Sequence, residues 1–367
     1  MHEAEKKLGV AAADLDTRPF LITFENGTLD LETMTLGPHR REHLITKMVH
    51  HTYNPKATLL PRFLGLLEHA VGEEAMPYMQ KLLGYSLTGD TSEKTFIVVW
   101  GAGDTGKTTF LEIVRKLLEE YAVLLQVDTL MDRHGSDSAV QEDLAALRGM
   151  RIATTSELDQ GRKLSIAVIK RIVQGQRRIT ASAKYEKKIT FTETHKLWFD
   201  TNHLPTIPAD EQAVWNRVAV VVFCNPVPKD KQDKKLAATI LREEAEGILA
   251  WMAEGERLRQ ENGLGNVPES FNLEKEKWQK NMDAIQQFID ERCQKRGGLR
   301  EKSDALYQSY VAWIGNLEHA MSHRAFTQRL AKLGITLDKG RRYYEGLALI
   351  KEADEPAETI FEWRVKA

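Results

Sequence analysis

Short apolar runs in the middle of the chain are separated by longer stretches in which apolar residues recur at helical spacing. Runs of this length predict buried β-strands, and the stretches between them predict helices. The predicted strands are residues 96–100, 151–155, 196–201 and 218–223. Strands that alternate with helices favour a mostly parallel sheet. We therefore predict an α/β domain over residues 91–265.

Residues 1–90 predict a mainly helical domain that begins with a β-hairpin. Two apolar runs flank the pair Asn26-Gly27, which is a strong signal for a hairpin turn. Helical spacing follows at 61–69 and at 73–83, and Gly84 predicts the end of the second of these helices.

Beyond Pro226 the chain becomes charged and its apolar residues keep helical spacing. Ser322 is placed to cap the last of these helices, and two short strands are expected around Lys339-Gly340. Two helices followed by a β-hairpin are the outline of a winged helix, so we predict a helical linker and a winged-helix-like domain over residues 266–367. The helices are predicted at residues 235–260, 281–294, 303–314 and 322–333.

Basic residues gather in this last helix and in the expected wing. One acid, Asp338, accompanies them, and an exposed charged turn that binds nothing is the alternative. We expect Arg341 and Arg342 to contact DNA. The basic residues are Arg324, Arg329, Lys332, Lys339, Arg341 and Arg342.

The first predicted strand of the α/β domain leads into a glycine-rich loop. Glycines let backbone N–H groups wrap a triphosphate, because a Cβ would block the close approach. Lys107 would then reach the β- and γ-phosphates, and the Thr108 hydroxyl would bind Mg²⁺. A strand before the loop and an amphipathic helix after it, at 109–118, argue against a turn without ligand. ATP and Mg²⁺ are the expected cofactors. The predicted nucleotide-binding residues are Gly101, Ala102, Gly103, Asp104, Thr105, Gly106, Lys107, Thr108 and Thr109.

Three further positions complete the expected catalytic site. Glu157 follows the second strand and is the candidate acid for Mg²⁺ and the attacking water, with Asp159 as an open second acid and a helix cap as the alternative. Asn202 ends the third strand and could position water or touch the γ-phosphate, or form an Asx turn. Arg217 precedes the fourth strand and is either a surface ion-pair partner or a finger that stabilises charge on the transferred phosphate.

The most basic stretch lies between these motifs, at 162–188, where nine Lys or Arg residues accompany one acid, Glu186. Alternation at 178–183 and 189–194 predicts two strands joined by a tip. Lysines at such a tip can meet phosphates and a tyrosine can stack on a base, as single-strand binders do, whereas a plain charged turn is the alternative. The expected DNA-contacting residues of the tip are Lys184, Tyr185, Lys187 and Lys188.

The composition limits the remaining possibilities. A net charge of −2 for 367 residues implies that nucleic-acid contact is local. Two cysteines, Cys224 and Cys293, are too few for a disulfide framework or a cysteine-based zinc site. The absence of a signal peptide or a membrane-spanning run, together with the few cysteines, favours the cytoplasm of a host cell.

At this point the sequence resembles the superfamily 3 helicases, and within them the phage and plasmid primase-helicases of the poxvirus D5 and satellite phage P4 type. The resemblance covers nearly the whole chain. Before the loop it includes Asn26-Gly27-Thr28-Leu29-Asp30-Leu31, Tyr53-Asn54-Pro55-Lys56-Ala57 and Gly84-Tyr85-Ser86-Leu87-Thr88-Gly89. After the loop it includes Ser156-Glu157, Ile169-Lys170-Arg171, Gly175, Thr201-Asn202, Pro205, Trp215-Asn216-Arg217 and Phe223.

The resemblance implies a hexameric AAA+ ring that hydrolyses ATP between subunits and moves 3′ to 5′ along single-stranded DNA. It implies that Lys107 and Thr108 belong to the first motif, Glu157 to the acidic motif and Asn202 to the sensor. It also implies that Arg217 is the finger given to the adjacent subunit, and that Lys184, Lys187 and Lys188 belong to a hairpin that grips DNA in the pore.

The chain differs from the family at two places. Thr105 stands where the family often has Asn, and Ser156-Glu157 stands where many members have paired acids, so the second metal ligand is left open between Ser156 and Asp159. Family members carry a primase domain upstream, for which about twenty residues before the match leave no room. A standalone protein and a piece of a longer polypeptide are both open.

Two functions are therefore expected from the sequence. The first is an ATP-driven DNA helicase for the replication of a phage, plasmid or other mobile element, with single-stranded and duplex DNA, other copies of the chain and a primase or polymerase as partners. The second is an initiator or loader that assembles on DNA with ATP and unwinds little.

Overall fold

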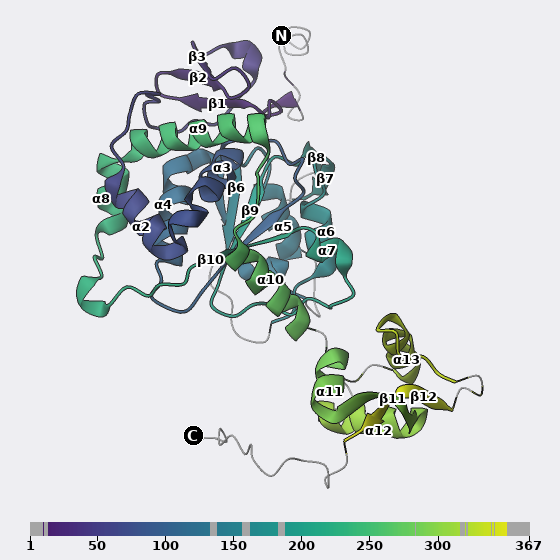
Figure 1. The fold of residues 1–367 in the computed structure, drawn as a ribbon. Coiled ribbons are helices and arrows are strands. Elements are labelled where there is room, and N and C mark those ends of the chain that lie inside the picture. The colour runs from purple at the N-terminus through teal and green to yellow at the C-terminus, as the bar shows by residue number, and fades with distance from the viewer. Residues whose placement is uncertain are drawn as a thin grey trace. The chain divides into compact units, whose positions relative to one another are not determined.

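The computed structural model divides the chain into two compact units, Met1–Gln279 and Lys280–Ala367 (Figure 1). The domain boundaries expected near residues 90 and 265 stay predictions. No helix in the described ranges is long and apolar enough to cross a membrane. The structure describes residues 10, 14–132, 138–155, 162–182, 188–282, 284–315, 320, 322–338, 340 and 342–350.

A five-stranded parallel sheet forms the centre of the first unit, in the order β10-β4-β9-β6-β5. The α/β fold and the four strands expected from the sequence are confirmed. The inner strands β4, β9 and β6 are buried along almost their whole length because helices cover both faces of the sheet. The strands are β4 (Phe96–Trp100), β5 (Ala122–Leu125), β6 (Ile152–Thr155), β9 (Lys196–Thr201) and β10 (Val218–Val222).

Helices lie on either side of this sheet, with α2 and α4 on one side and α5 and α6 on the other (Figure 1). The helix α4 begins at Lys107, two residues earlier than expected, directly after the glycine-rich loop. The helix α2 (Pro61–Val71) comes before β4 in the chain. The helices between β4 and β10 are α4 (Lys107–Leu118), α5 (Ser138–Ala146), α6 (Ile166–Ile172) and α7 (Gln212–Trp215).

An antiparallel sheet of three strands precedes them, formed by β1 (Leu21–Phe24), β2 (Gly27–Asp30) and β3 (Thr35–Gly37). The expected hairpin is confirmed, but its two-residue turn is Glu25-Asn26, because Gly27 already pairs with Phe24. A glycine is required at this strand position because a Cβ there would overlap the carbonyl of Gly37 on β3.

Gly84 does not end its helix, so that prediction was wrong. The helix α3 (Met76–Leu87) continues past it and packs on α9 (Ala245–Asn262). A Cβ on Gly84 would overlap the backbone of α9, and a Cβ on Gly255 would overlap the backbone of α3 at Gln80. The two glycines let the helix backbones approach closely, and this packing role explains Gly84 inside the helix.

The single helix expected at 235–260 is in fact two, α8 (Leu236–Glu243) and α9. Glu244 separates them with φ −121° and ψ 2°. Its buried carboxylate accepts hydrogen bonds from the backbone N–H groups of Arg62 (3.0 Å) and Phe63 (2.9 Å) at the start of α2. A carboxylate at a helix N-terminus satisfies backbone N–H groups that have no partner within the helix. The break between α8 and α9 therefore places a capping carboxylate at the start of α2.

A further helix, α10 (Glu269–Asn281), was not expected. It is fixed by Trp278, which contacts Trp215 with ring centroids 4.9 Å apart and donates a hydrogen bond to the carbonyl of Pro205. The expected helix at 281–294 is shorter and begins after α10, as α11 (Ala284–Arg292).

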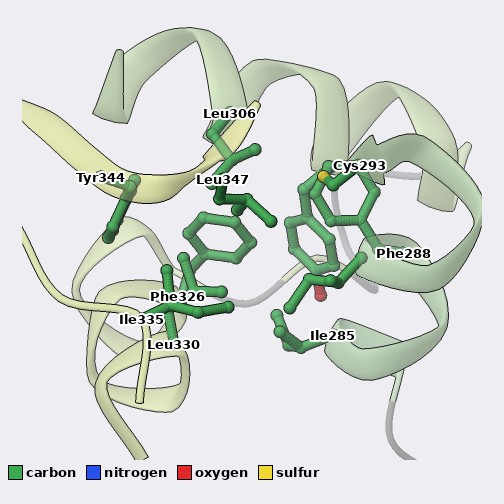
Figure 2. Packing of buried hydrophobic residues seen from close by; sticks show 11 residues of the cluster. Ile285, Phe288, Cys293, Leu306, Phe326, Leu330, Ile335, Tyr344 and Leu347 are labelled. Carbon is green, nitrogen blue, oxygen red and sulfur yellow. The ribbon is translucent and has the colours of Figure 1, made fainter. Parts of the chain in front are cut away.

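The second unit has the order α11, β11 (Cys293–Lys302), α12 (Ser303–Ile314), α13 (His323–Lys332) and β12 (Tyr343–Leu349). Figure 2 shows its core, in which side chains from the helices and both strands converge, among them Phe288, Phe326 and Leu347. The expected cap is confirmed, since Ser322 Oγ accepts a hydrogen bond from the N–H of Ala325.

The strands of this unit differ from expectation. In place of two short strands around residue 339, the long β12 pairs antiparallel with β11, which lies between α11 and α12. A single bridge joins Leu337 to Tyr344. β11 could not be predicted from hydrophobic patterning because it is polar and largely exposed.

We predict that Gly84→Ala lowers the free energy of unfolding by about 2 kcal/mol, because the new methyl group separates α3 from α9. Gly65→Ala is the matched control, since a Cβ there meets nothing within 4 Å. It is expected to raise stability by about 0.5–1 kcal/mol through helix propensity. Chemical denaturation measures both changes, and equal effects of the two substitutions would contradict the assignment.

Candidate nucleotide-binding site

The glycine-rich loop runs from the carboxyl end of β4 to the start of α4. Asp104 and Gly106 have φ values of 62° and 87°, the left-handed region that favours glycine. A Cβ on Gly101 would overlap the carbonyl of Phe223, whereas a Cβ on Gly103 would meet no atom within 4 Å. Gly101 is therefore required by the fold itself, and the loop is open at Gly103.

Lys107 lies inside this loop with 5% of its surface exposed. Its Nζ donates hydrogen bonds to the carbonyls of Gly101 (2.9 Å) and Ala102 (2.8 Å). It also donates to Asn202 Oδ1 at 2.6 Å. Because β4 and β9 are parallel neighbours, the loop after β4 and the residue after β9 meet at one edge of the sheet. The structure thus brings together two of the residues that the sequence singled out, 95 positions apart.

Thr108 contacts a carboxylate that sequence reasoning missed. Its Oγ1 donates a hydrogen bond of 2.9 Å to Oδ2 of Asp200, which lies on β9 with 3% of its surface exposed. Asp200 lies within β9, two residues before Asn202, which follows the end of the strand. An acid inside an otherwise apolar run was the signal that could have found it.

A cavity of about 260 Å³ adjoins this pair, between α4 and the strands β5, β6 and β9. Thr108, Asp200, Thr154 and Thr155 give it oxygen atoms, and Thr155 Oγ1 is buried without a hydrogen-bond partner. Among the described residues no group of three or more His, Cys, Asp or Glu could hold a metal ion. A hydroxyl and a carboxylate beside a phosphate-binding loop are nevertheless the oxygen ligands that suit Mg²⁺, which takes further ligands from phosphate and water.

The expected acid Glu157 lies outside the described residues, as do Ser156 and Asp159. The strand before them, β6, ends at Thr155 on the same edge of the sheet as the loop, with β9 between β6 and β4. Their roles stay predictions.

Arg217 is not part of this site. Its carbonyl accepts a hydrogen bond from Phe96 N–H, which places it beside the first residue of β4, at the opposite edge of the sheet from the loop. A strand of five residues spans about 16 Å. The Arg217 guanidinium donates hydrogen bonds to the carbonyls of Val173 (2.9 Å) and Ala213.

The basic hairpin is present as β7 (Arg178–Ala181) paired antiparallel with β8 (Ile189–Thr192), which confirms both predicted strands. Lys188 is exposed beside β8. Lys184, Tyr185 and Lys187 lie outside the described residues.

In the second unit Arg342 is exposed and Arg341 lies outside the described residues. The loop before β12 is held by Asp338, which accepts the backbone N–H of Arg342 (2.9 Å) and forms an ion pair with Arg300 (2.9 Å). Asp338, the one acid of this basic stretch, therefore stabilises the loop through contacts within its own unit.

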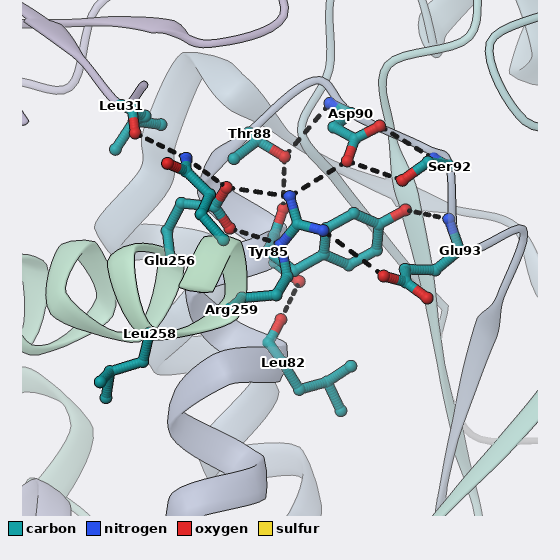
Figure 3. A network of polar contacts seen from close by, with 12 residues as sticks. Leu31, Leu82, Tyr85, Thr88, Asp90, Ser92, Glu93, Glu256, Leu258 and Arg259 are labelled. Atoms are coloured by element: carbon teal, nitrogen blue, oxygen red, sulfur yellow. Dashed lines mark hydrogen bonds and ion pairs between the residues drawn. The ribbon is translucent and has the colours of Figure 1, made fainter. Parts of the chain in front are cut away.

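A buried polar network holds the other end of β9 (Figure 3). Arg259 of α9 forms ion pairs with Glu256 (2.7 Å) and Asp90 (3.1 Å) and lies 4.7 Å from the ring centre of Tyr85. Charges removed from water are costly unless they are paired in this way. The network therefore joins α3, α9 and the segment that leads into β4.

Lys196, the first residue of β9, joins the same network with 1% of its surface exposed. Its Nζ donates hydrogen bonds to the carbonyls of Thr88 and Asp90 and lies 4.7 Å from the ring centre of Tyr85. Burial, together with the charge of Arg151, lowers the pKa of Lys196 well below its usual value. The strand that carries Asp200 and Asn202 is thus fixed at its far end by polar contacts.

Glu193 lies between β8 and β9 and is 2% exposed. Its carboxylate accepts the backbone N–H groups of Gln174 and Gly175, both at 3.0 Å, in the turn that follows α6. Burial raises the pKa of Glu193 to about 7, although these hydrogen bonds and the charges of Lys196 and Arg217 act in the opposite direction.

Two family models match the chain. Residues 1–72 match the model described as D5 N terminal like, and residues 99–217 match a family of unknown function, DUF5906. Together with the relatives described below, these matches make the chain similar to proteins of the primase-helicase type. The second match spans the glycine-rich loop, Asn202 and Arg217, so it covers the residues assembled above.

Curated relatives of this primase-helicase type come from large DNA viruses. The chain is 27% identical over 226 residues to a protein named "putative helicase" from Acanthamoeba polyphaga mimivirus, which covers 60% of this chain and 23% of the relative. It is 25% identical over 303 residues to a protein named "putative primase" from African swine fever virus, which covers 76% of this chain and 31% of the relative. The chain therefore spans about a quarter to a third of the length of these relatives.

A solved structure shares the fold. The apo structure of the NrS-1 C terminal region has a TM-score of 0.52 and 14% sequence identity, and the match covers 80% of this chain and 78% of that one. At this identity the likeness concerns the fold alone.

The raised pKa of Glu193 predicts a pH dependence of stability. A carboxyl group whose pKa is higher in the folded state stabilises the fold at low pH, and this contribution is lost as the pH rises from about 4.5 through about 7. Glu193→Gln keeps the hydrogen-bond acceptor and cannot ionise. We expect the stability of the wild type, relative to this variant, to fall by about 2–3 kcal/mol between pH 5 and pH 8.

Chemical denaturation at several pH values measures this difference. Exposed Glu32 is the matched control, because Glu32→Gln should leave the pH profile of the wild type unchanged. Parallel profiles for the wild type and Glu193→Gln would show that Glu193 has no raised pKa.

Proposed function

We propose that the chain is an ATP-dependent DNA helicase motor of the AAA+ type, a superfamily 3 member that works as a ring on single-stranded DNA during viral, phage or plasmid replication. The observation that carries this proposal is the contact of Lys107 with Asn202 inside a loop built to hold phosphates. Direction 3′ to 5′ and a hexameric ring are part of the same proposal. The viral relatives support a role in DNA replication.

The residues of the loop fit ATP with Mg²⁺. Lys107 would give up some of its carbonyl partners for the β- and γ-phosphates, and backbone N–H groups at the start of α4 face the same place. Thr108, with Glu157, would hold Mg²⁺, and Asn202 would position the attacking water. Bound Mg²⁺-ATP would supply phosphoryl transfer to that water.

The position of Arg217 supports an assembly of several subunits. Arg217 and the loop of its own chain lie at opposite edges of the sheet, so Arg217 cannot serve the phosphates bound by its own chain. A neighbour in a ring could offer its Arg217 to the loop, as an arginine finger does in trans. Each site would then lie between two subunits.

Two basic surfaces are available for DNA. The first is the hairpin of β7 and β8 with Lys188 and the tip residues Lys184, Tyr185 and Lys187, which we propose contacts single-stranded DNA. The second is the Lys280–Ala367 unit, which we propose is a winged helix with Arg341 and Arg342 on its wing.

The separate fold of the second unit also favours a second candidate function. Its helices and antiparallel strands form a compact body of their own, with Arg324 and Arg342 exposed. A separate basic module suits an initiator or loader that recognises a DNA site and assembles with ATP without processive unwinding. A primase or polymerase is the expected partner in either role.

The leading function predicts that the purified chain displaces a strand from a tailed duplex in the presence of ATP and Mg²⁺. Lys107→Ala should abolish ATP hydrolysis and displacement, because the charge that neutralises the phosphates is lost. Lys116→Ala, on the exposed side of the same helix, is the control and should keep both activities. Assembly on DNA without displacement by the wild type would favour the loader, and normal turnover by Lys107→Ala would contradict the site.

The trans role of Arg217 predicts complementation between inactive variants. Arg217→Ala should bind nucleotide normally and hydrolyse ATP at least about 100-fold more slowly. Mixed with Lys107→Ala, it should regain part of its activity, because some interfaces then combine an intact loop with an intact arginine. Exposed Arg242→Ala serves as the control for loss of a positive charge. Mixtures that never exceed the single variants would exclude a role of Arg217 in trans.

A further inference from the structure

We propose that Asp200 is a carboxylate of the magnesium site, supplied by β9 in addition to the expected acid Glu157 after β6. This inference rests on the proposed binding of Mg²⁺-nucleotide by the loop. It assigns a function to a residue of β9 that lies two positions before Asn202.

The hydrogen bond between Thr108 and Asp200 is the first argument. A threonine hydroxyl that binds a cation does so through the lone pairs of its oxygen, so its proton must be donated elsewhere. Asp200 Oδ2 accepts that proton at 2.9 Å, which leaves the oxygen of Thr108 turned for a metal ion. A neutral acceptor would serve the same orientation but would add no negative charge.

The position of Asp200 is the second argument. In the pairing of β4 with β9, Asp200 lies opposite Val99, two residues before the loop begins. Its carboxylate is therefore level with the base of the loop and 97% buried. Mg²⁺ bound at Thr108 would lie beside this buried carboxylate, and burial strengthens the attraction between opposite charges.

The adjoining cavity is the third and independent argument. Thr108, Asp200 and Thr155 line the same space of about 260 Å³. Thr155 Oγ1 is fully buried there without a hydrogen-bond partner. A buried hydroxyl in this condition indicates a site for water or a hydrated ion, and Mg²⁺ usually keeps several of its waters.

The acidic residues of the described site also favour this assignment. The strand β6 ends in Thr154 and Thr155, which are hydroxyls and carry no charge. Glu112 also lines the cavity but forms an ion pair with Lys116 at 2.6 Å. Asp200 is the carboxylate that contacts the hydroxyl of Thr108.

The test separates a charge that binds metal from an acceptor that orients Thr108. Asp200→Asn keeps the acceptor and removes the charge, so the affinity for Mn²⁺ in the presence of ADP, measured by electron paramagnetic resonance, should fall about 10- to 100-fold. The affinity for a fluorescent ADP analogue in EDTA should stay near that of the wild type, which also shows that the variant is folded. Glu112→Gln, which removes a charge from the same cavity, should leave both affinities unchanged.

An unchanged Mn²⁺ affinity of Asp200→Asn would overturn the proposal and leave Asp200 as a positioning residue for Thr108. If Asp200→Asn does not fold, the smaller neutral variant Asp200→Ser takes its place with the same two outcomes. A wild type that binds neither ADP nor Mn²⁺ would instead refute the proposed nucleotide binding itself, so the two failures are distinguishable.

Discussion

The parallel pairing of β4 with β9 is the interaction on which the site depends. It aligns Trp100 with Thr201, so the glycine-rich loop and Asn202 leave the sheet at the same level. Lys107 and Thr108 then reach Asn202 and Asp200 without any long loop to guide them. A slip of one residue between these strands would turn Asp200 to the other face of the sheet, and the contact between Thr108 and Asp200 would be lost.

The same strand is held at its beginning by charges rather than by apolar packing. Lys196 joins a network with Asp90, Arg259 and Glu256, all of which are buried. Figure 3 shows the part of this network around Arg259. Such a network gives little net stability, since the cost of removing charges from water offsets most of the attraction. It does define one arrangement of α3, α9 and β9, because any other would leave a buried charge without a partner.

The sequence predicted the inner strands of the parallel sheet better than the elements at its periphery. The inner strands β4 and β9 are almost wholly buried and most of their residues are apolar, so both could be predicted. At the edge, β5 has Leu124 48% exposed and was missed, and α10 was missed because only Phe271 and Trp278 are buried in it. In the site, the loop and Asn202 followed from local patterns. The role of Asp200 could not, since it depends on which strand lies beside β4.

The close contact of Gly84 with α9 has a consequence for how the protein can be divided. The helix α3 comes before the sheet in the chain and α9 comes after it, yet their backbones touch. A fragment that begins at β4 would lose the partner of Gly255 together with Tyr85, and Arg259 would keep Glu256 but not the ring above it. The parallel sheet and the segment before it therefore form one inseparable body, and the smallest piece that can be expressed with its candidate site intact must include residues well upstream of the loop.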